Sequence, residues 1–299
     1  MPVVQYKFSL FCHAGLLLLA VFLSGRVPDC HAAMAVSRPI PDRLARIVYQ
    51  EKPESKQKIY IVAQSHPSAL TGENAADTLQ VQAEIYRIGE WLIENRGIGV
   101  LLPEGYFQKE TKGAAIKTRC GREVVRDGRA LPDATLLDRL AATDHFVNAG
   151  LLLHDDFGIS LRQIEDRGLH ANVCLLLGEL VQPEPDDNLP AIAAALDYQQ
   201  KKRSAALLRN IPDALAAGAD DQERFRGNAL LTVGLAHLKE MVAFLRNGKT
   251  VVDPFSRGAE RSKGYCCDLA QLKNNYGITI LLPPTLAQNK DLRPLITFN

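Results

Sequence analysis

The sequence predicts an α/β fold with a mainly parallel central sheet flanked by helices. Short apolar runs rich in β-branched residues alternate along the chain with longer segments of helical periodicity. This alternation is typical of parallel sheets, whose strands are joined by crossover helices. The composition agrees, because 46% of the 299 residues are hydrophobic and 23% are charged, as in ordinary globular proteins.

The first half of the predicted domain is strand, helix, strand. Residues 59–63 are an apolar, β-branched run, which is typical of a buried strand. Residues 77–95 are predicted to be a helix, because four apolar residues recur there at spacings of four, three and four and form one stripe. Those four residues are Val81, Ile85, Ile88 and Leu92. Residues 99–102 are the second predicted strand.

The second half continues the alternation. Residues 159–164 are the third predicted strand, and residues 192–217 form a long helical stretch rich in Ala and Leu. We expect Pro212 to interrupt this helix, because proline lacks the N–H of the helical hydrogen bond. Residues 230–233 are the fourth strand, a helix that ends at Gly248 follows it, and residues 278–282 are the fifth strand.

The charge balance excludes two classes of protein. Lys and Arg total 35, Asp and Glu total 34, and the formal net charge is +1. The chain therefore lacks the bulk positive charge of a nucleic-acid binder and the net charge of an acidic disordered chain. No apolar run of about 18 residues lies outside the N-terminal segment, which excludes several membrane spans. We expect a small-molecule or peptide substrate and no nucleic-acid partner, and the sequence leaves the oligomeric state open.

Residues 1–33 have the pattern of a signal peptide. Lys7 precedes an apolar core over residues 14–23, and a small-residue tract follows at residues 32–35. The core is short for a membrane span. We therefore expect an exported protein, periplasmic or extracellular, with no membrane span after cleavage and a single α/β domain over residues 38–299. The alternative is an uncleaved N-terminal anchor.

Cleavage of the signal would leave four cysteines in an oxidising compartment, which permits disulfides. A bridge from Cys120 to Cys266 or Cys267 is one open arrangement, since pairings cannot be deduced from sequence. Cys174 lies in an apolar segment and is expected to be a buried free thiol.

An ionisable residue follows each of the first four predicted strands. In an open α/β sheet, ligands bind at the carboxyl ends of the strands. We therefore expect these side chains to converge on one site that holds a divalent metal or supplies acid–base groups. Each of them alone could equally be a turn or helix-cap residue. In chain order they are His66, Glu104, Glu165 and His237.

The motifs around these residues resemble those of the superfamily that includes TraB/GumN-like proteins, Tiki metalloproteases, haem-binding ChaN-like proteins and erythromycin esterases. Residues 63–66 are similar to the strand ending Gly-x-x-His of that superfamily, with Ala63 in place of Gly. Glu104 is similar to its acidic strand end, and Leu208-Arg209-Asn210 resembles its Arg-Asn element. Residues 233–238 resemble its late Val-Gly-x-x-His-Leu motif. The resemblance spans residues 59–252.

The resemblance implies an exported metal-dependent hydrolase, peptidase-like in the manner of the Tiki proteins. Arg209 and Asn210 would stabilise an oxyanion or orient a ligand, and Glu165 would serve as a general base. Mixed histidine and carboxylate ligation suits Zn²⁺, Mn²⁺, Co²⁺ or Fe²⁺, and the sequence does not select among them. The metal ligands or acid–base groups would be His66, Glu104 and His237.

Two other functions remain open at this stage. The resemblance to ChaN-like proteins implies a haem- or cofactor-binding protein without hydrolase activity, with Tyr106 as the axial ligand. The residues at the strand ends could instead be structural in a degenerate family member, an alternative that Ala63 favours. The sequence contains no nucleophile-elbow, phosphate-loop, His-Glu-x-x-His or Rossmann motif, which disfavours those enzyme classes.

Overall fold

The computed structural model describes residues 38–65, 76–108, 133–141, 148–184, 188–217, 227–252, 256–257, 260–261 and 264–290. The residues from Pro39 to Asn299 form one compact unit. The predicted signal peptide, His66 and Cys120 lie outside the described residues. Within the described part of the chain, no helix combines the length and the apolar character that crossing a membrane requires.

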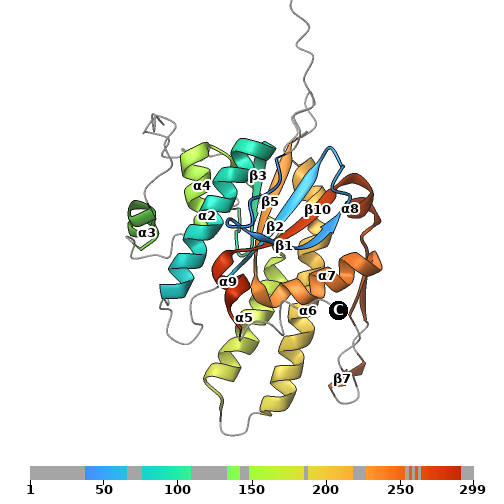
Figure 1. The fold of residues 1–299 in the computed structure, drawn as a ribbon. Coiled ribbons are helices and arrows are strands. Elements are labelled where there is room, and N and C mark those ends of the chain that lie inside the picture. The colour runs from blue at the N-terminus through green and yellow to red at the C-terminus, as the bar shows by residue number, and fades with distance from the viewer. Residues whose placement is uncertain are drawn as a thin grey trace, which may run out of the picture. The chain divides into compact units, whose positions relative to one another are not determined.

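A six-stranded sheet forms the centre of this unit (Figure 1). Five of its strands run parallel to one another, and the edge strand β1 pairs antiparallel with β10. The predicted α/β fold with a mainly parallel sheet is therefore confirmed. The order across the sheet is β1 (Arg46–Glu51), β10 (Gly277–Leu282), β2 (Lys58–Gln64), β5 (Asn228–Gly234), β3 (Ile98–Pro103) and β4 (Ser160–Leu161).

The inner strands are buried along almost their whole length, because helices cover both faces of a parallel sheet. No residue from Ile59 to Ala63 in β2 is more than 2% exposed, and every residue of β10 is buried. The predicted strands at residues 59–63, 99–102, 230–233 and 278–282 are confirmed.

The two edges of the sheet differ from the prediction. The third predicted strand, residues 159–164, is reduced to the two residues of β4, because an edge strand pairs with one neighbour only. The amide of Arg162 still donates to the carbonyl of Leu101 at 2.9 Å before the chain turns away. The sequence analysis missed β1, whose half-exposed residues lack the continuous apolar run of an inner strand.

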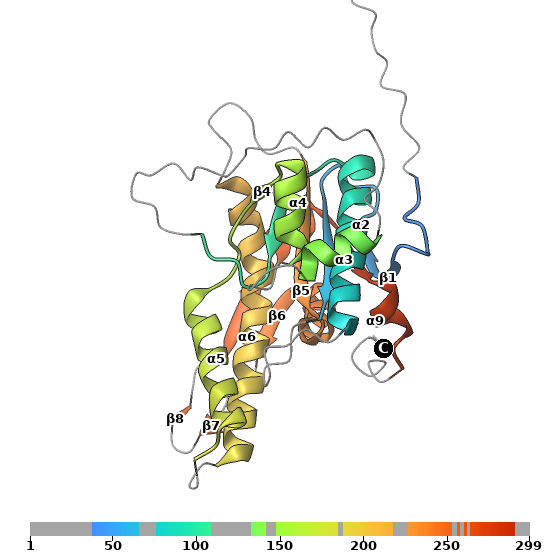
Figure 2. The ribbon, with the colours of Figure 1, turned by 90° about the vertical axis from the view of Figure 1, so that its left-hand side faces the viewer.

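The helices fall into two groups. α2 (Ala76–Arg96) contacts α3 (Asp133–Ala141), α4 (Ala149–Phe157) and α9 (Pro284–Gln288). α6 (Leu189–Ala216) contacts α5 (Arg167–Val181), α7 (Leu238–Asn247) and α8 (Ala270–Asn275). Figure 2 shows α2 and α6 on opposite sides of the strands. Two small antiparallel pairs complete the unit: β6 (Lys249–Val252) with β9 (Tyr265–Asp268), and β7 (Ser256–Arg257) with β8 (Glu260–Arg261).

The predicted helices at residues 77–95 and after the fourth strand are confirmed. The apolar stripe of α2 faces the core with at most 1% exposure, and α7 ends where Gly248 adopts a left-handed φ of 68°. The predicted interruption at Pro212 is wrong, because α6 continues to Ala216. Arg162 supports this last turn by donating to the carbonyls of Ala214 and Leu215 at 2.9 and 2.8 Å.

The chain connections create a switch point between β2 and β5. The connection from β2 to β3 passes β5 in one direction, and the connection from β5 to β10 passes β2 in the other. Adjacent strands whose connections leave in opposite directions open a crevice at their carboxyl ends. Gln64 and Gly234 are register partners there, and the 3-10 helix η1 (Leu235–His237) begins directly after them.

Candidate functional site

Four ionisable side chains from distant parts of the chain meet in one buried group, which we call the Glu–Arg–His cluster. Glu104 follows β3 directly, and Glu165 precedes α5. Arg203 lies in the middle of α6, and His237 ends η1. None of the four is more than 8% exposed. The structure thus brings together three of the residues that the sequence predicted, Glu104, Glu165 and His237, and adds Arg203.

Arg203 joins the two carboxylates. Its Nε and Nη2 donate to Oε1 and Oε2 of Glu165 at 2.9 and 2.7 Å, the forked geometry in which a guanidinium binds a carboxylate most strongly. Its Nη2 also lies 2.8 Å from Oε1 of Glu104. Burial opposes the positive charge of Arg203, but its hydrogen bonds to Glu165 and the charges of both carboxylates outweigh burial and raise the pKa of the guanidinium. Arg203 is therefore a permanent cation in the cluster.

Glu165 is held on both oxygens. Besides Arg203, the backbone N–H of Gly105 donates to its Oε2 at 3.1 Å. The next residue, Asp166, is the N-cap of α5, and its side chain accepts from the amide of Leu169 at 3.0 Å. The helix cap is therefore Asp166 and not Glu165. Because both oxygens of Glu165 accept hydrogen bonds, its carboxylate orients Arg203. This favours a positioning role for Glu165 over the predicted role as a general base.

Glu104 and His237 form the second contact of the cluster. Oε1 of Glu104 lies 3.3 Å from Nε2 of His237, and its Oε2 accepts from the backbone N–H of Gly234. On the other side of the imidazole, Nδ1 lies 2.7 Å from Oγ of Ser204, which is 1% exposed. The imidazole is therefore fixed between a carboxylate and a hydroxyl.

The hydroxyl of Ser204 is coupled to the tautomer of His237, because it can donate to Nδ1 or accept from it. It has one proton and two neighbouring acceptors, Nδ1 of His237 and the carbonyl of Gln200 at 3.0 Å. When Ser204 donates to Gln200, Nδ1 carries the proton and Nε2 turns a lone pair toward Glu104. A lone pair that faces a carboxylate is favourable only with a cation between them, either a proton or a metal ion.

The charges of the Glu–Arg–His cluster also bear on a cation between Glu104 and His237. Among the four side chains, two carboxylates meet one guanidinium. A cation between Glu104 and His237 would add positive charge beside these carboxylates.

The geometry of this contact also fits a pair of metal ligands. Two ligands of a tetrahedral zinc ion, each about 2.0–2.1 Å from the metal, lie about 3.3 Å from each other. Nε2 of His237 and Oε1 of Glu104 have this separation, 3.3 Å. The described residues contain no group of three His, Cys, Asp or Glu side chains that could hold a metal ion. The third predicted ligand, His66, lies outside them.

Three predicted site residues do not contact the cluster through any described interaction. Asn210 donates through Nδ2 to the carbonyl of Ile164 at 2.8 Å and so anchors the segment that leads into Glu165. Arg209 is exposed, and its guanidinium carbon lies 5.8 Å from the ring centre of Tyr265. Tyr106 is half-buried after β3, where its amide donates to the carbonyl of Pro103 at 3.2 Å. Arg203, and not Arg209, therefore meets the carboxylates.

The sequence does carry a signal for Arg203. It lies seven residues after Leu196 and four before Leu207, within the buried stripe of α6. An arginine in an apolar stripe is rarely buried without a partner, so its position predicts a buried carboxylate. The neighbouring Lys201 and Lys202 obscure this signal, because together the three residues resemble a solvated basic run.

The cysteines also differ from expectation. Cys174 is exposed on α5, where its Sγ lies 3.7 Å from Nδ1 of His170, so its predicted burial is wrong. Val173 is the only buried residue of α5, because this helix packs on α6 and leaves most of its surface uncovered by the described residues. Cys266 and Cys267 are free thiols.

Comparison of the chain with protein-family models, with curated proteins and with solved structures finds no match. The family resemblance therefore stays a prediction.

Proposed function

We propose that the protein is an exported metal-dependent hydrolase in which Glu104 and His237 hold a divalent ion. The contact between Nε2 of His237 and Oε1 of Glu104, which lie 3.3 Å apart in a buried cluster, carries this proposal. His66 is the third ligand that the sequence leads us to expect. When bound, such an ion polarises a carbonyl and lowers the pKa of a water molecule toward neutrality.

Ser204, Arg203 and Glu165 have different roles around the proposed metal ion. Ser204 orients the imidazole of His237 through Nδ1, as partners of metal-bound histidines commonly do. Arg203 orients Glu104 through the contact of its Nη2 with Oε1. Glu165 keeps Arg203 in place through the fork and so acts as a positioning residue.

Metal content tests the proposal without any knowledge of the substrate. The mature protein is purified as wild type and as His237→Gln and Glu104→Gln, and bound metals are measured by elemental analysis. His170→Gln is the matched control, because His170 lies on α5 and its described contacts do not include the cluster. We expect stoichiometric metal in the wild type and the control and its loss in both cluster variants, with unchanged circular dichroism.

Retention of the metal in both cluster variants would refute the proposal, as would a wild-type protein that holds none after exposure to Zn²⁺, Mn²⁺, Co²⁺ and Fe²⁺. Release of amines from a mixture of short peptides then tests the hydrolase activity of the metal-loaded protein. The haem alternative is tested on the same preparation. A Soret band that forms with micromolar haemin and is lost in Tyr106→Phe would replace the hydrolase with a haem-binding protein.

A further inference from the structure

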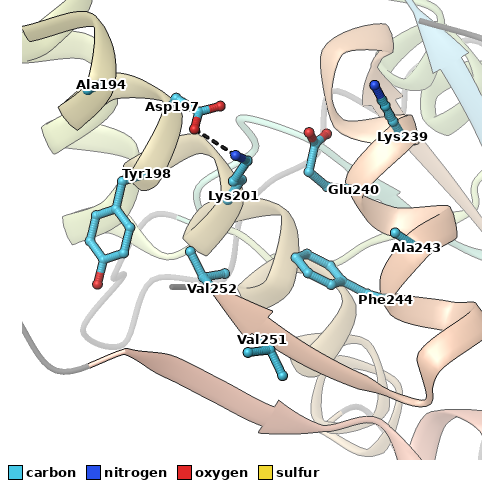
Figure 3. A pocket seen from close by; sticks show the side chains of 10 residues that line it. All are labelled: Ala194, Asp197, Tyr198, Lys201, Lys239, Glu240, Ala243, Phe244, Val251 and Val252. Carbon is cyan, nitrogen blue, oxygen red and sulfur yellow. Dashed lines mark hydrogen bonds and ion pairs between the residues drawn. The ribbon is translucent and has the colours of Figure 1, made fainter. Parts of the chain in front are cut away.

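A cavity of about 560 Å³ opens between α6, α7 and β6 (Figure 3). This volume lies within the range of about 300–1,000 Å³ that is usual for small-molecule sites. Part of its lining is apolar, with Phe244 and Val252 only 7% and 3% exposed. The charged residues of the lining balance one another, with two carboxylates and two ammonium groups: Asp197, Glu240, Lys201 and Lys239.

Two of these charged groups are available to a ligand. Lys201 donates to Asp197 at 2.7 Å, and an ammonium group has three N–H donors, so further donors remain. Glu240 is half-buried and makes no hydrogen bond or ion pair with any residue that the structure describes. Figure 3 shows Lys201 on α6, with its ammonium joined to Asp197, and Glu240 on α7. An ammonium donor and a carboxylate acceptor thus flank one apolar cavity.

The cavity adjoins the Glu–Arg–His cluster along the α6–α7 contact. Ser204 lies three residues after Lys201, and His237 lies three residues before Glu240. Three residues correspond to about one helical turn, or about 4.5 Å along the axis. The hydrogen-bonded pair of Ser204 and His237 therefore lies about one turn from Lys201 on α6 and about one turn from Glu240 on α7.

We propose that this cavity binds the zwitterionic head and apolar side chain of an α-amino acid or a short peptide. The ligand carboxylate binds Lys201, the ligand ammonium binds Glu240, and the side chain packs on Phe244 and Val252. The assignment of the cavity as a substrate or product subsite rests on the proposed hydrolase function. Ligand binding itself does not depend on a metal.

Calorimetric titration of the mature protein tests the site with defined probes. L-leucine and L-leucyl-L-leucine carry the complete head and side chain, and they distinguish a free amino acid from a peptide. 4-Methylpentanoate lacks the ammonium, 3-methylbutylamine lacks the carboxylate, and glycine lacks the apolar side chain. Glu240→Gln and Lys201→Gln remove one head contact each. Glu94→Gln on the exposed surface of α2 is the matched control.

We expect leucine, its dipeptide or both to bind, with affinity reduced about tenfold or more in Glu240→Gln and Lys201→Gln and less than twofold in Glu94→Gln. Absence of binding by both complete probes would overturn the proposal. Equal affinity for 4-methylpentanoate, or unchanged affinity in Glu240→Gln, would do the same.

A titration after chelation separates this proposal from the hydrolase proposal. Unchanged leucine or dipeptide affinity in the chelated protein and in His237→Gln supports the subsite, even where the metal analysis has refuted the hydrolase. Binding that disappears on chelation would place the ligand on the metal itself and overturn the subsite.

Discussion

Replacement of Arg203 by methionine is the most informative perturbation of the cluster. The change removes the guanidinium that contacts both Glu104 and Glu165, and it leaves two carboxylates that are at most 8% exposed. Removal of one partner from a buried charge pair typically costs about 3–5 kcal/mol, because the remaining charge is buried without compensation. We expect a loss of this size in the free energy of unfolding of Arg203→Met.

Urea denaturation of the mature protein, followed by circular dichroism, measures this loss. For a domain of this size, a loss of about 3–5 kcal/mol corresponds to a decrease in Tm of about 6–20 °C. Arg209→Met is the matched control on the same helix. Arg209 is exposed, and its described contacts are the side chain of Asn210 and the ring of Tyr265, so its loss should change stability by about 0.5 kcal/mol or less.

The pH dependence of the difference is a further check. The pKa of Arg203 is raised, chiefly because the bonded carboxylates outweigh its burial, and a raised folded-state pKa gives stability that is lost only as pH rises through that value. The contribution of Arg203 should thus be constant between about pH 7 and 9. A loss below about 1 kcal/mol in Arg203→Met, or an equal loss in Arg209→Met, would refute the cluster as described.

Three further predictions follow from single contacts. Ser204→Ala removes the hydrogen bond to Nδ1 of His237 and should weaken metal affinity by about 10–100-fold in a competition titration with a chelating dye, whereas unchanged affinity would contradict the orienting role. Leu92→Ala, at a residue with 0% exposure in α2, should cost about 2–5 kcal/mol in urea denaturation, while Leu175→Ala, at 64% exposure, should cost far less. Gly248→Ala should destabilise the protein by about 1–2 kcal/mol, because the φ of Gly248 at the end of α7 is 68°. Gly178→Ala should stabilise it by about 0.5–1 kcal/mol, because no atom lies within 4 Å of the Cβ that would be added. A lower Tm for Gly178→Ala than for Gly248→Ala would refute the assignment of the helix cap.

Elements with a continuous local pattern were predictable from the sequence. β2 and β10 are buried on both faces and show as uninterrupted apolar runs, and the stripe of α2 has the helical period. The edge strand β1 was missed because strand formation there depends on pairing with β10, more than 200 residues later in the chain. The prediction that Pro212 interrupts α6 was wrong for a similar reason. Buried contacts and the hydrogen bond from Arg162 stabilise the end of the helix beyond Pro212.

The candidate site was predictable only in part. Polar residues after buried strands pointed to Glu104, Glu165 and His237, because strand ends in a parallel sheet meet at one edge. The apolar stripe of α6 places Arg203 on the buried face of the helix, but the neighbouring Lys201 and Lys202 obscure this signal. The partner of Arg203 required the structure, because Glu165 lies 38 residues away in the chain.

The sequence by itself determined the class of fold, the inner strands and the ionisable residues that follow them, because these depend on local hydrophobic periodicity. Only the tertiary structure decided that Arg203 bridges the carboxylates, that Ser204 orients His237 and that a charged cavity lies one turn away. Those contacts depend on the rotation and separation of packed helices, which are set by long-range packing and not by the pattern of any single segment.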